Sequence, residues 1–147
     1  MQSYRIRMTV LACALLIATA SALNARPDAY LAVKAVRLNK EFTLKQGHRV
    51  TLKSTSLRIK FAAVENDSRC PSDVTCVWAG NAAVQVELGT GRRSEILTLN
   101  TGKGGSLVSE LEYKGYRVKL VSLSPYPRSD RKIAAKDYAA TLLVTRV

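Results

Sequence analysis

The stretch "LRIKFA" (residues 57–62) decides the fold, because apolar and polar side chains alternate along it. Such alternation is typical of a strand with one buried face and one polar face. The same period recurs in residues 84–88, 116–120 and 138–144, and the last of these is fairly apolar on both faces. We therefore predict an all-β protein in which residues 138–144 form an inner strand.

Glycine, proline and small polar residues separate the predicted strands. The separating stretches read "ENDSRCPSDVT", "GTGRR", "NTGKGGS" and "SPYPRSDRK", and strands recur about every ten to fifteen residues. This spacing predicts a single-domain antiparallel β-sandwich, immunoglobulin-like, with about seven to nine strands. A small closed barrel is the alternative. Within the domain, "EFTLKQGHRVTLK" (residues 41–53) predicts a hairpin that turns near Gly47.

The N-terminus reads as a secretory signal peptide. Arg5 and Arg7 precede a short uncharged, mostly apolar run, and Ala20-Ser21-Ala22 supplies the small residues that signal peptidase requires. We expect residues 1–22 to be removed, with cleavage as late as residue 25, leaving a β-sandwich domain at 26–147. The protein is then periplasmic or extracellular, with no transmembrane segment. Lipid attachment at Cys13, which ends a lipobox-like sequence, is the alternative.

The chain is strongly basic. Its formal net charge of +12 falls to +10 when Arg5 and Arg7 leave with the signal peptide. A charge of this size favours acidic partners. Aromatic residues make up only 6% of the chain, and an exported protein does not meet nucleic acid, so nucleic acid is not the expected partner. We expect a monomer whose partner is an unknown protein or an anionic envelope component.

Two cysteines, Cys70 and Cys76, remain after processing. An even count in an exported chain predicts a disulfide. A metal site is the alternative, but this spacing is unusual for zinc and no other Cys or His is near in sequence. We predict no metal and no cofactor.

The chain's only tryptophan, Trp78, follows the second cysteine. If one strand runs from Cys76 to Val84, Trp78 shares the face of Val84 and packs into the core beside the disulfide. We favour this buried position. A bulge at residues 79–81 would instead turn Trp78 outward, as a contact residue beside Arg69.

The segment "DSRCPSDVTCVWAGNAAVQVEL" (residues 67–88), with "GYRVKLVSLSPYP" and "DYAATLLV", resembles a group of uncharacterised small exported bacterial proteins. These share an SRCP-x-x-V-x-C-x-WAG-x-A motif, so the resemblance implies a bacterial envelope protein. A weaker likeness, of shape, is to the chagasin-type inhibitors of cysteine proteases, immunoglobulin-like domains that insert three loops into a protease cleft. The disulfide segment, "TGKGGS" and "SPYPRSD" are candidate loops in a similar order.

Catalytic patterns are weak in this sequence. The single histidine, His48, lies beside a predicted turn and has no sequence sign of a nucleophile or an orienting acid. Glu65, Asp67 and Asp73 are close in sequence and could hold calcium or transfer protons, but loop acids commonly cap turns. We predict that the protein is not an enzyme.

We predict a periplasmic or envelope binding or accessory protein that acts through loops at one end of the sandwich. A protease inhibitor of chagasin-like shape, or a basic protein that binds an anionic envelope component, is the alternative. The candidate binding residues are Asp67, Arg69, Asp73, Trp78, Tyr126, Arg128 and Arg131.

Overall fold

A computed structural model describes residues 34–102 and 104–147. Predictions that concern residues 1–33, among them the signal peptide and Cys13, lie outside the described residues.

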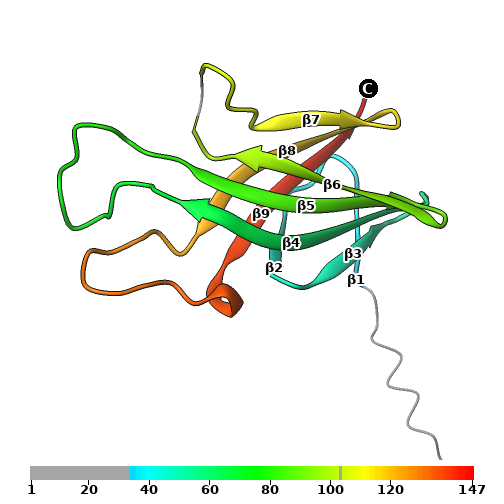
Figure 1. Ribbon diagram of the computed structural model, residues 1–147. Helices are drawn as coiled ribbons and strands as arrows, with labels where there is room; N and C mark the ends of the chain where they lie inside the picture. The colour runs from blue at the N-terminus through cyan, green and yellow to red at the C-terminus, as the bar shows by residue number, and fades with distance from the viewer. Residues whose placement is uncertain (1–33, 103) are drawn as a thin grey trace, which may run out of the picture. The chain divides into compact units, whose positions relative to one another are not determined.

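The described chain forms two β-sheets (Figure 1). The first sheet has the order β1 (Lys34–Val36), β3 (Arg49–Leu52), β4 (Leu57–Asp67), β5 (Ala82–Thr90) and β6 (Arg93–Asn100). The second has the order β2 (Phe42–Lys45), β9 (Ala139–Arg146), β8 (Tyr116–Ser124) and β7 (Glu110–Tyr113). The prediction of an all-β sandwich is confirmed, with nine strands in the described residues.

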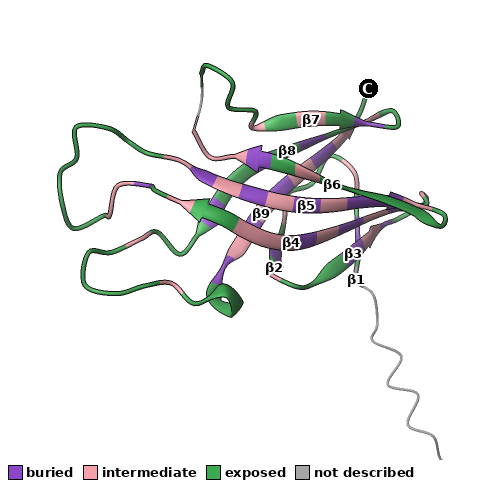
Figure 2. Cartoon of the chain, viewed as in Figure 1, coloured by how far each residue is buried: buried purple, intermediate pink, exposed green. Residues whose placement is uncertain are grey.

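The core lies between the sheets and follows the alternation of the sequence. Every second residue of β4 and β5, from Leu57 to Phe61 and from Ala82 to Leu88, is buried, and Figure 2 shows this alternation along both ribbons. Val118, Leu142 and Val144 cover these residues from the second sheet. Burying each such side chain contributes roughly 1.5–3 kcal/mol, so this periodic pattern drives the sheets together.

The likeness to an immunoglobulin domain is in the two-sheet architecture, not in the strand order. Strands β3 to β6 pair with their sequence neighbours in one sheet, whereas immunoglobulin sheets mix distant strands in a Greek key. One pairing departs from the predicted antiparallel arrangement, because β1 runs parallel to β3.

The predicted hairpin at residues 41–53 is wrong. β2 pairs with β9 in one sheet, whereas β3 pairs with β4 in the other. The turn at Gly47 exists, but Gln46 N–H donates to the Tyr138 carbonyl and Gly47 N–H to the Phe61 carbonyl. The chain therefore crosses between the sheets here. The amphipathic pattern fits either arrangement, since both leave Leu44 and Val50 in the core.

Three longer connections lie at the same end of the sandwich, which we call the loop end (Figure 1). The disulfide loop (residues 68–81) joins β4 to β5, the glycine loop (residues 101–109) joins β6 to β7, and the basic loop (residues 125–138) joins β8 to β9. The basic loop contains the 3-10 turn Ala135–Asp137. Within the described residues, no helix is long and apolar enough to cross a membrane.

Candidate functional site

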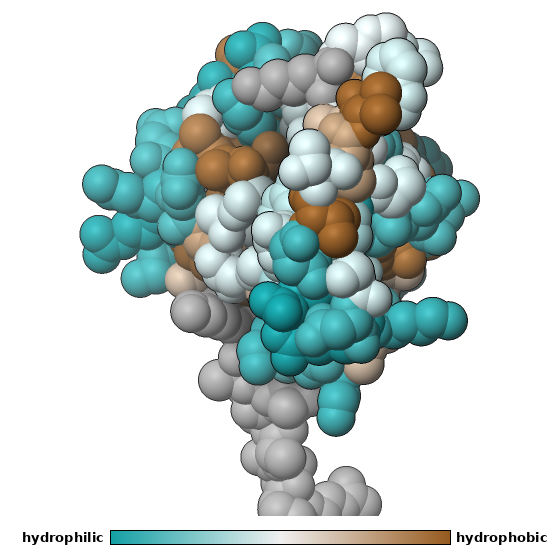
Figure 3. All heavy atoms as spheres, turned by 90° about the vertical axis from the view of Figure 1, so that its left-hand side faces the viewer, coloured by the Kyte–Doolittle hydropathy of each residue, from teal (hydrophilic) through white to brown (hydrophobic). Residues whose placement is uncertain are grey.

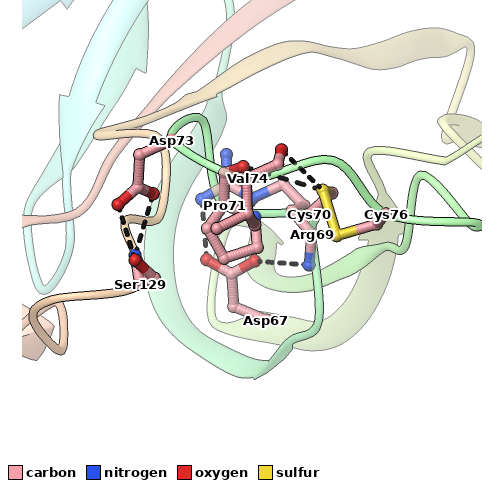
Figure 4. Close-up of a disulfide and its surroundings, with 8 residues drawn as sticks. All are labelled: Asp67, Arg69, Cys70, Pro71, Asp73, Val74, Cys76 and Ser129. Atoms are coloured by element: carbon pink, nitrogen blue, oxygen red, sulfur yellow. Dashed lines mark hydrogen bonds and ion pairs between the residues drawn. A yellow bond between two sulfur atoms is a disulfide. The ribbon is translucent and has the colours of Figure 1, made fainter.

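The predicted disulfide is present between Cys70 and Cys76, whose Cα atoms are 5.9 Å apart. Figure 4 shows it inside the disulfide loop, with Pro71 and Asp73 in the turn that it closes. Cys70 N–H also donates to the Ala79 carbonyl at 2.9 Å, and Ser68 N–H to the Asn81 carbonyl at 2.7 Å. These bonds close the loop at its base, so the segment between the cysteines is held as a compact projection.

A buried ion pair lies beneath the disulfide. The guanidinium of Arg69, which is only 6% exposed, donates to both carboxylate oxygens of Asp67, at 2.8 and 2.6 Å. Its remaining N–H groups reach the carbonyls of Leu123 at 2.6 Å and Pro125 at 3.0 Å. Tyr138 donates its hydroxyl hydrogen to Asp67 at 3.0 Å. We call Asp67, Arg69 and Tyr138 the base cluster; it joins the end of β4 to the end of β8 and the start of β9.

The proposed roles of Asp67 and Arg69 as accessible contact residues are therefore wrong. Both side chains are almost completely buried and hydrogen-bonded to one another. From the sequence, a basic residue in a polar loop is expected to be exposed. Arg69 can be buried because the carbonyl groups of Leu123 and Pro125, distant in sequence, accept its hydrogen bonds.

The environment shifts the pKa values of this cluster. Burial alone would raise the pKa of Asp67, but the hydrogen bonds and charge of Arg69, with the Tyr138 hydroxyl, together bring it below the usual 3.8. Burial, followed by the hydrogen bond to Asp67 and its negative charge, raises the pKa of Tyr138 to about 12. At neutral pH Asp67 is therefore ionised and Tyr138 is neutral.

The disulfide loop and the basic loop meet directly. Ser129 donates its backbone N–H and its hydroxyl to the two carboxylate oxygens of Asp73, at 2.9 and 2.6 Å (Figure 4). Ser72 N–H donates to the Pro127 carbonyl at 2.9 Å. The hydrogen bonds from Ser129 lower the pKa of Asp73. Asp73, predicted as a binding residue, thus holds the two loops together.

The glycine loop joins the disulfide loop through Asn81. The Asn81 amide donates to the Asn100 side chain at 2.7 Å and accepts from the backbone N–H of Gly102 at 2.9 Å. The three predicted loops therefore lie side by side at one end of the sandwich.

The favoured prediction that Trp78 is buried is wrong, because its side chain is 82% exposed. β5 begins only at Ala82, so the alternation that buries Val84 does not extend back to Trp78. Gly80 interrupts it with φ +70°, and a Cβ there would overlap the carbonyl oxygen of Ser68. The alternative, a bulge at residues 79–81 that turns Trp78 outward, has the right exposure, but these residues lie in the loop before β5 and form no bulge in a strand.

Large exposed apolar side chains gather at the loop end. Val77 is 90% exposed beside Trp78, and Tyr126 is 54% exposed in the basic loop. The others at this end are Val74, Leu107, Val108 and Val121. Figure 3 views this end and shows brown apolar groups above a teal polar area. The sequence prediction missed Val74 and Val77, although an apolar run within a turn-rich segment was the available signal.

Two hollows flank Tyr126. The larger, of about 620 Å³, lies between the disulfide and glycine loops and β8, with Gly80, Gly102 and Lys119 in its walls. The smaller, of about 280 Å³, is lined by Arg128, Arg131 and Lys132. The Tyr126 ring, shared by both, lies 4.9 Å from the guanidinium carbon of Arg69.

The predicted basic residues Arg128 and Arg131 are exposed. Both approach Asp130, at 3.2 and 3.9 Å. The hydrogen bond and charge of Asp130, with the charge of Asp73, raise the pKa of Arg128. The side chains of Arg128 and Arg131 remain 42% and 71% exposed, so both can still reach a partner.

The loop end combines exposed apolar and basic side chains. Among the described residues, no three His, Cys, Asp or Glu side chains gather in a way that could hold a metal ion. His48 lies in the turn between β2 and β3, outside the three loops. No protein family, curated protein or solved structure matches the chain.

Proposed function

We propose that the chain is an exported binding or accessory protein of the periplasm or envelope, which contacts its partner through the loop end. The observation that carries this proposal is the pair Val77 and Trp78, 90% and 82% exposed directly after Cys76 in a braced loop. We call this pair the tip. Surfaces of this kind mark sites of interaction, because leaving large apolar side chains in water forgoes the free energy of burial.

The bracing supports a binding role. The disulfide, the Asp73–Ser129 pair and the Asn81 contacts fix the disulfide loop before any partner arrives. A surface ordered in advance loses less conformational entropy on binding. Tryptophan, tyrosine and arginine are the residues that most often dominate binding energy, and Trp78, Tyr126 and Arg131 are exposed here.

Export is supported by the oxidised Cys70–Cys76 pair and by the signal-like N-terminal sequence. An oxidised disulfide persists in the periplasm and is rare in a reducing cytosol. The excess of basic residues favours an acidic partner there.

The test is affinity capture from native envelope extract with the immobilised, oxidised protein. We expect material that binds the original protein but not the Val77→Ser or Trp78→Ala variant. Ile96→Ser is the matched control, because Ile96 is 61% exposed on β6, away from the three loops. Equal capture by all four proteins would overturn the proposal.

A second candidate is inhibition of cysteine proteases by the same three loops. Its support is their side-by-side position with an exposed aromatic residue in the first of them. Inhibition of a papain-like enzyme that is lost in Trp78→Ala would favour it. Full protease activity at micromolar protein would eliminate it.

A further inference from the structure

We propose that the loop end docks on an anionic lipid surface. In this arrangement, which rests on the proposed binding function, Val77 and Trp78 enter the boundary between headgroups and acyl chains. Arg128, Arg131 and Lys132 lie against the phosphate groups.

The apolar part of this surface is the most projecting part of the described sandwich. Figure 1 shows the disulfide loop extending further from the two sheets than its neighbours. This loop presents Val77 and Trp78, the two most exposed large apolar side chains among the described residues. An indole ring suits the membrane interface, because its apolar body enters the acyl region while its N–H stays hydrated.

The cationic part lies directly beside the tip. The basic loop is held against the disulfide loop by the Asp73–Ser129 and Ser72–Pro127 hydrogen bonds. Its smaller hollow is lined by Arg128, Arg131 and Lys132, with Tyr126 at the edge. Asp130 and Asp137 offset part of this charge, but the Arg131 side chain is still 71% exposed. Such residues interact favourably with anionic headgroups, at about 1 kcal/mol each.

The placement of apolar groups favours a lipid surface over a protein that fills the hollow. The larger hollow has mixed walls, with Thr101, Ser109, Lys119 and Ser122 beside Leu120, Val121, Leu123 and Tyr126, and neither Val77 nor Trp78 lines it. The most exposed apolar groups project outward instead. An apolar point with cations behind it matches a bilayer, in which the acyl chains lie deeper than the phosphate groups.

Trp78 is the only tryptophan of the chain, so tryptophan fluorescence reports on this residue alone and provides the direct test. The protein is recovered after export from an expressing bacterium and its N-terminus is determined by mass spectrometry. It is mixed with vesicles of phosphatidylcholine that contain or lack phosphatidylglycerol. We expect a blue shift of Trp78 emission, and quenching by brominated acyl chains, with the anionic vesicles only.

Variants separate the two parts of the surface. Val77→Ser is expected to weaken vesicle binding about fivefold. Arg131→Ser with Lys132→Ser is expected to weaken it about tenfold or more. The matched controls are Ile96→Ser and the pair Arg92→Ser with Arg93→Ser, in the β5–β6 turn and at the start of β6, at the opposite end. These controls should bind as the original protein does.

The outcomes also separate this proposal from the binding function. An unchanged Trp78 spectrum with anionic vesicles overturns the lipid proposal. The lipid proposal is also overturned if the Arg92 and Arg93 controls weaken vesicle binding as much as the Arg131 and Lys132 variants do. Basic charge anywhere on the protein would then be enough for binding. If a protein is captured through Trp78 while vesicles are not bound, the lipid proposal fails and the binding function stands. If neither is bound, both fail.

Discussion

In the disulfide loop, a charged side chain is buried at the base and an apolar side chain is exposed at the tip. At the base, Arg69 is 6% exposed and surrounded by Asp67, Leu123 and Pro125. At the tip, Trp78 is 82% exposed. Soluble proteins usually place these residue types the other way round. The inversion indicates that the base stabilises the fold and the tip is free to bind, so variants of the two should fail in different assays.

The base is sensitive because its charges are desolvated and matched. The bidentate ion pair has two carbonyl acceptors and one phenol around it. Removing one member leaves the others buried without partners, which costs more free energy than the intact pair contributes.

The largest expected effect is that of Arg69→Ala. It leaves the buried carboxylate of Asp67 without its cation and should lower the free energy of unfolding by roughly 3–5 kcal/mol in urea denaturation. The matched control is Arg117→Ala, whose partner Glu112 is exposed, with a loss of about 1 kcal/mol or less. Equal losses for the two variants would show that burial adds nothing to the Arg69 pair.

Gly80→Ala should have the next largest effect. The new Cβ would overlap the Ser68 backbone, and the residue would keep a positive φ of +70°. Gly47→Ala is the control, because its φ is +83° but nothing lies within 4 Å of the added Cβ. We expect about 1 kcal/mol of destabilisation for Gly47→Ala and about 1–3 kcal/mol more for Gly80→Ala, measured by the same denaturation. If both substitutions lower the free energy of unfolding by similar amounts, the backbone around Gly80 can move to admit the Cβ without loss of stability.

Removal of the disulfide by Cys70→Ser with Cys76→Ser should cost about 2 kcal/mol, because the closed loop is short. The base cluster lies outside the bridged loop, so the fold should persist in thermal unfolding while the bridged segment loosens. Faster proteolysis between residues 70 and 76, with the sandwich intact, would show this separation. Cooperative loss of the whole fold would show instead that the bridge supports the base.

Acid provides a milder way to weaken the base cluster than deleting Arg69. In the folded protein the pKa of Asp67 lies below its usual value of 3.8, which applies to the unfolded chain. Between these two pKa values the unfolded chain therefore binds more protons than the folded protein. Its stabilising contribution is present above about pH 4 and is lost as the pH falls through the folded value. Denaturation from about pH 5 to about pH 2 should show a smaller slope in Asp67→Asn than in the original protein. An unchanged slope would mean that Asp67 does not titrate with folding.

The strands were predictable from the sequence because a period of two directly reports burial. Leu57, Ile59 and Phe61 are buried as their alternation predicts, and so are Val84, Val86 and Leu88. Sheet membership was not predictable, because the turn at Gly47 reads the same whether β2 and β3 pair or separate.

The candidate loops named from the sequence lie together in the structure, but Arg69 and Trp78 are placed otherwise than predicted. Cysteine and proline spacing located the disulfide loop, and Asp73 and Ser129 then joined it to a segment far away in sequence. The burial of Arg69 and the exposure of Trp78 both depend on such distant contacts and on the backbone angle of Gly80. Neither the burial of Arg69 nor the exposure of Trp78 can therefore be read from the local sequence pattern.

The smallest expected change in stability is at the tip. Val77→Ala should alter the free energy of unfolding by less than about 0.5 kcal/mol, because this side chain is 90% exposed. The same substitution at Val84, which is fully buried on β5, should cost about 2 kcal/mol through lost burial and a residual cavity. If the two substitutions cost the same, Val77 packs within the fold and the tip is not a free surface. If they differ as expected and Val77→Ala also loses its partner, the exposed side chain contributes to binding alone, which is the division of roles that the loop's two ends imply.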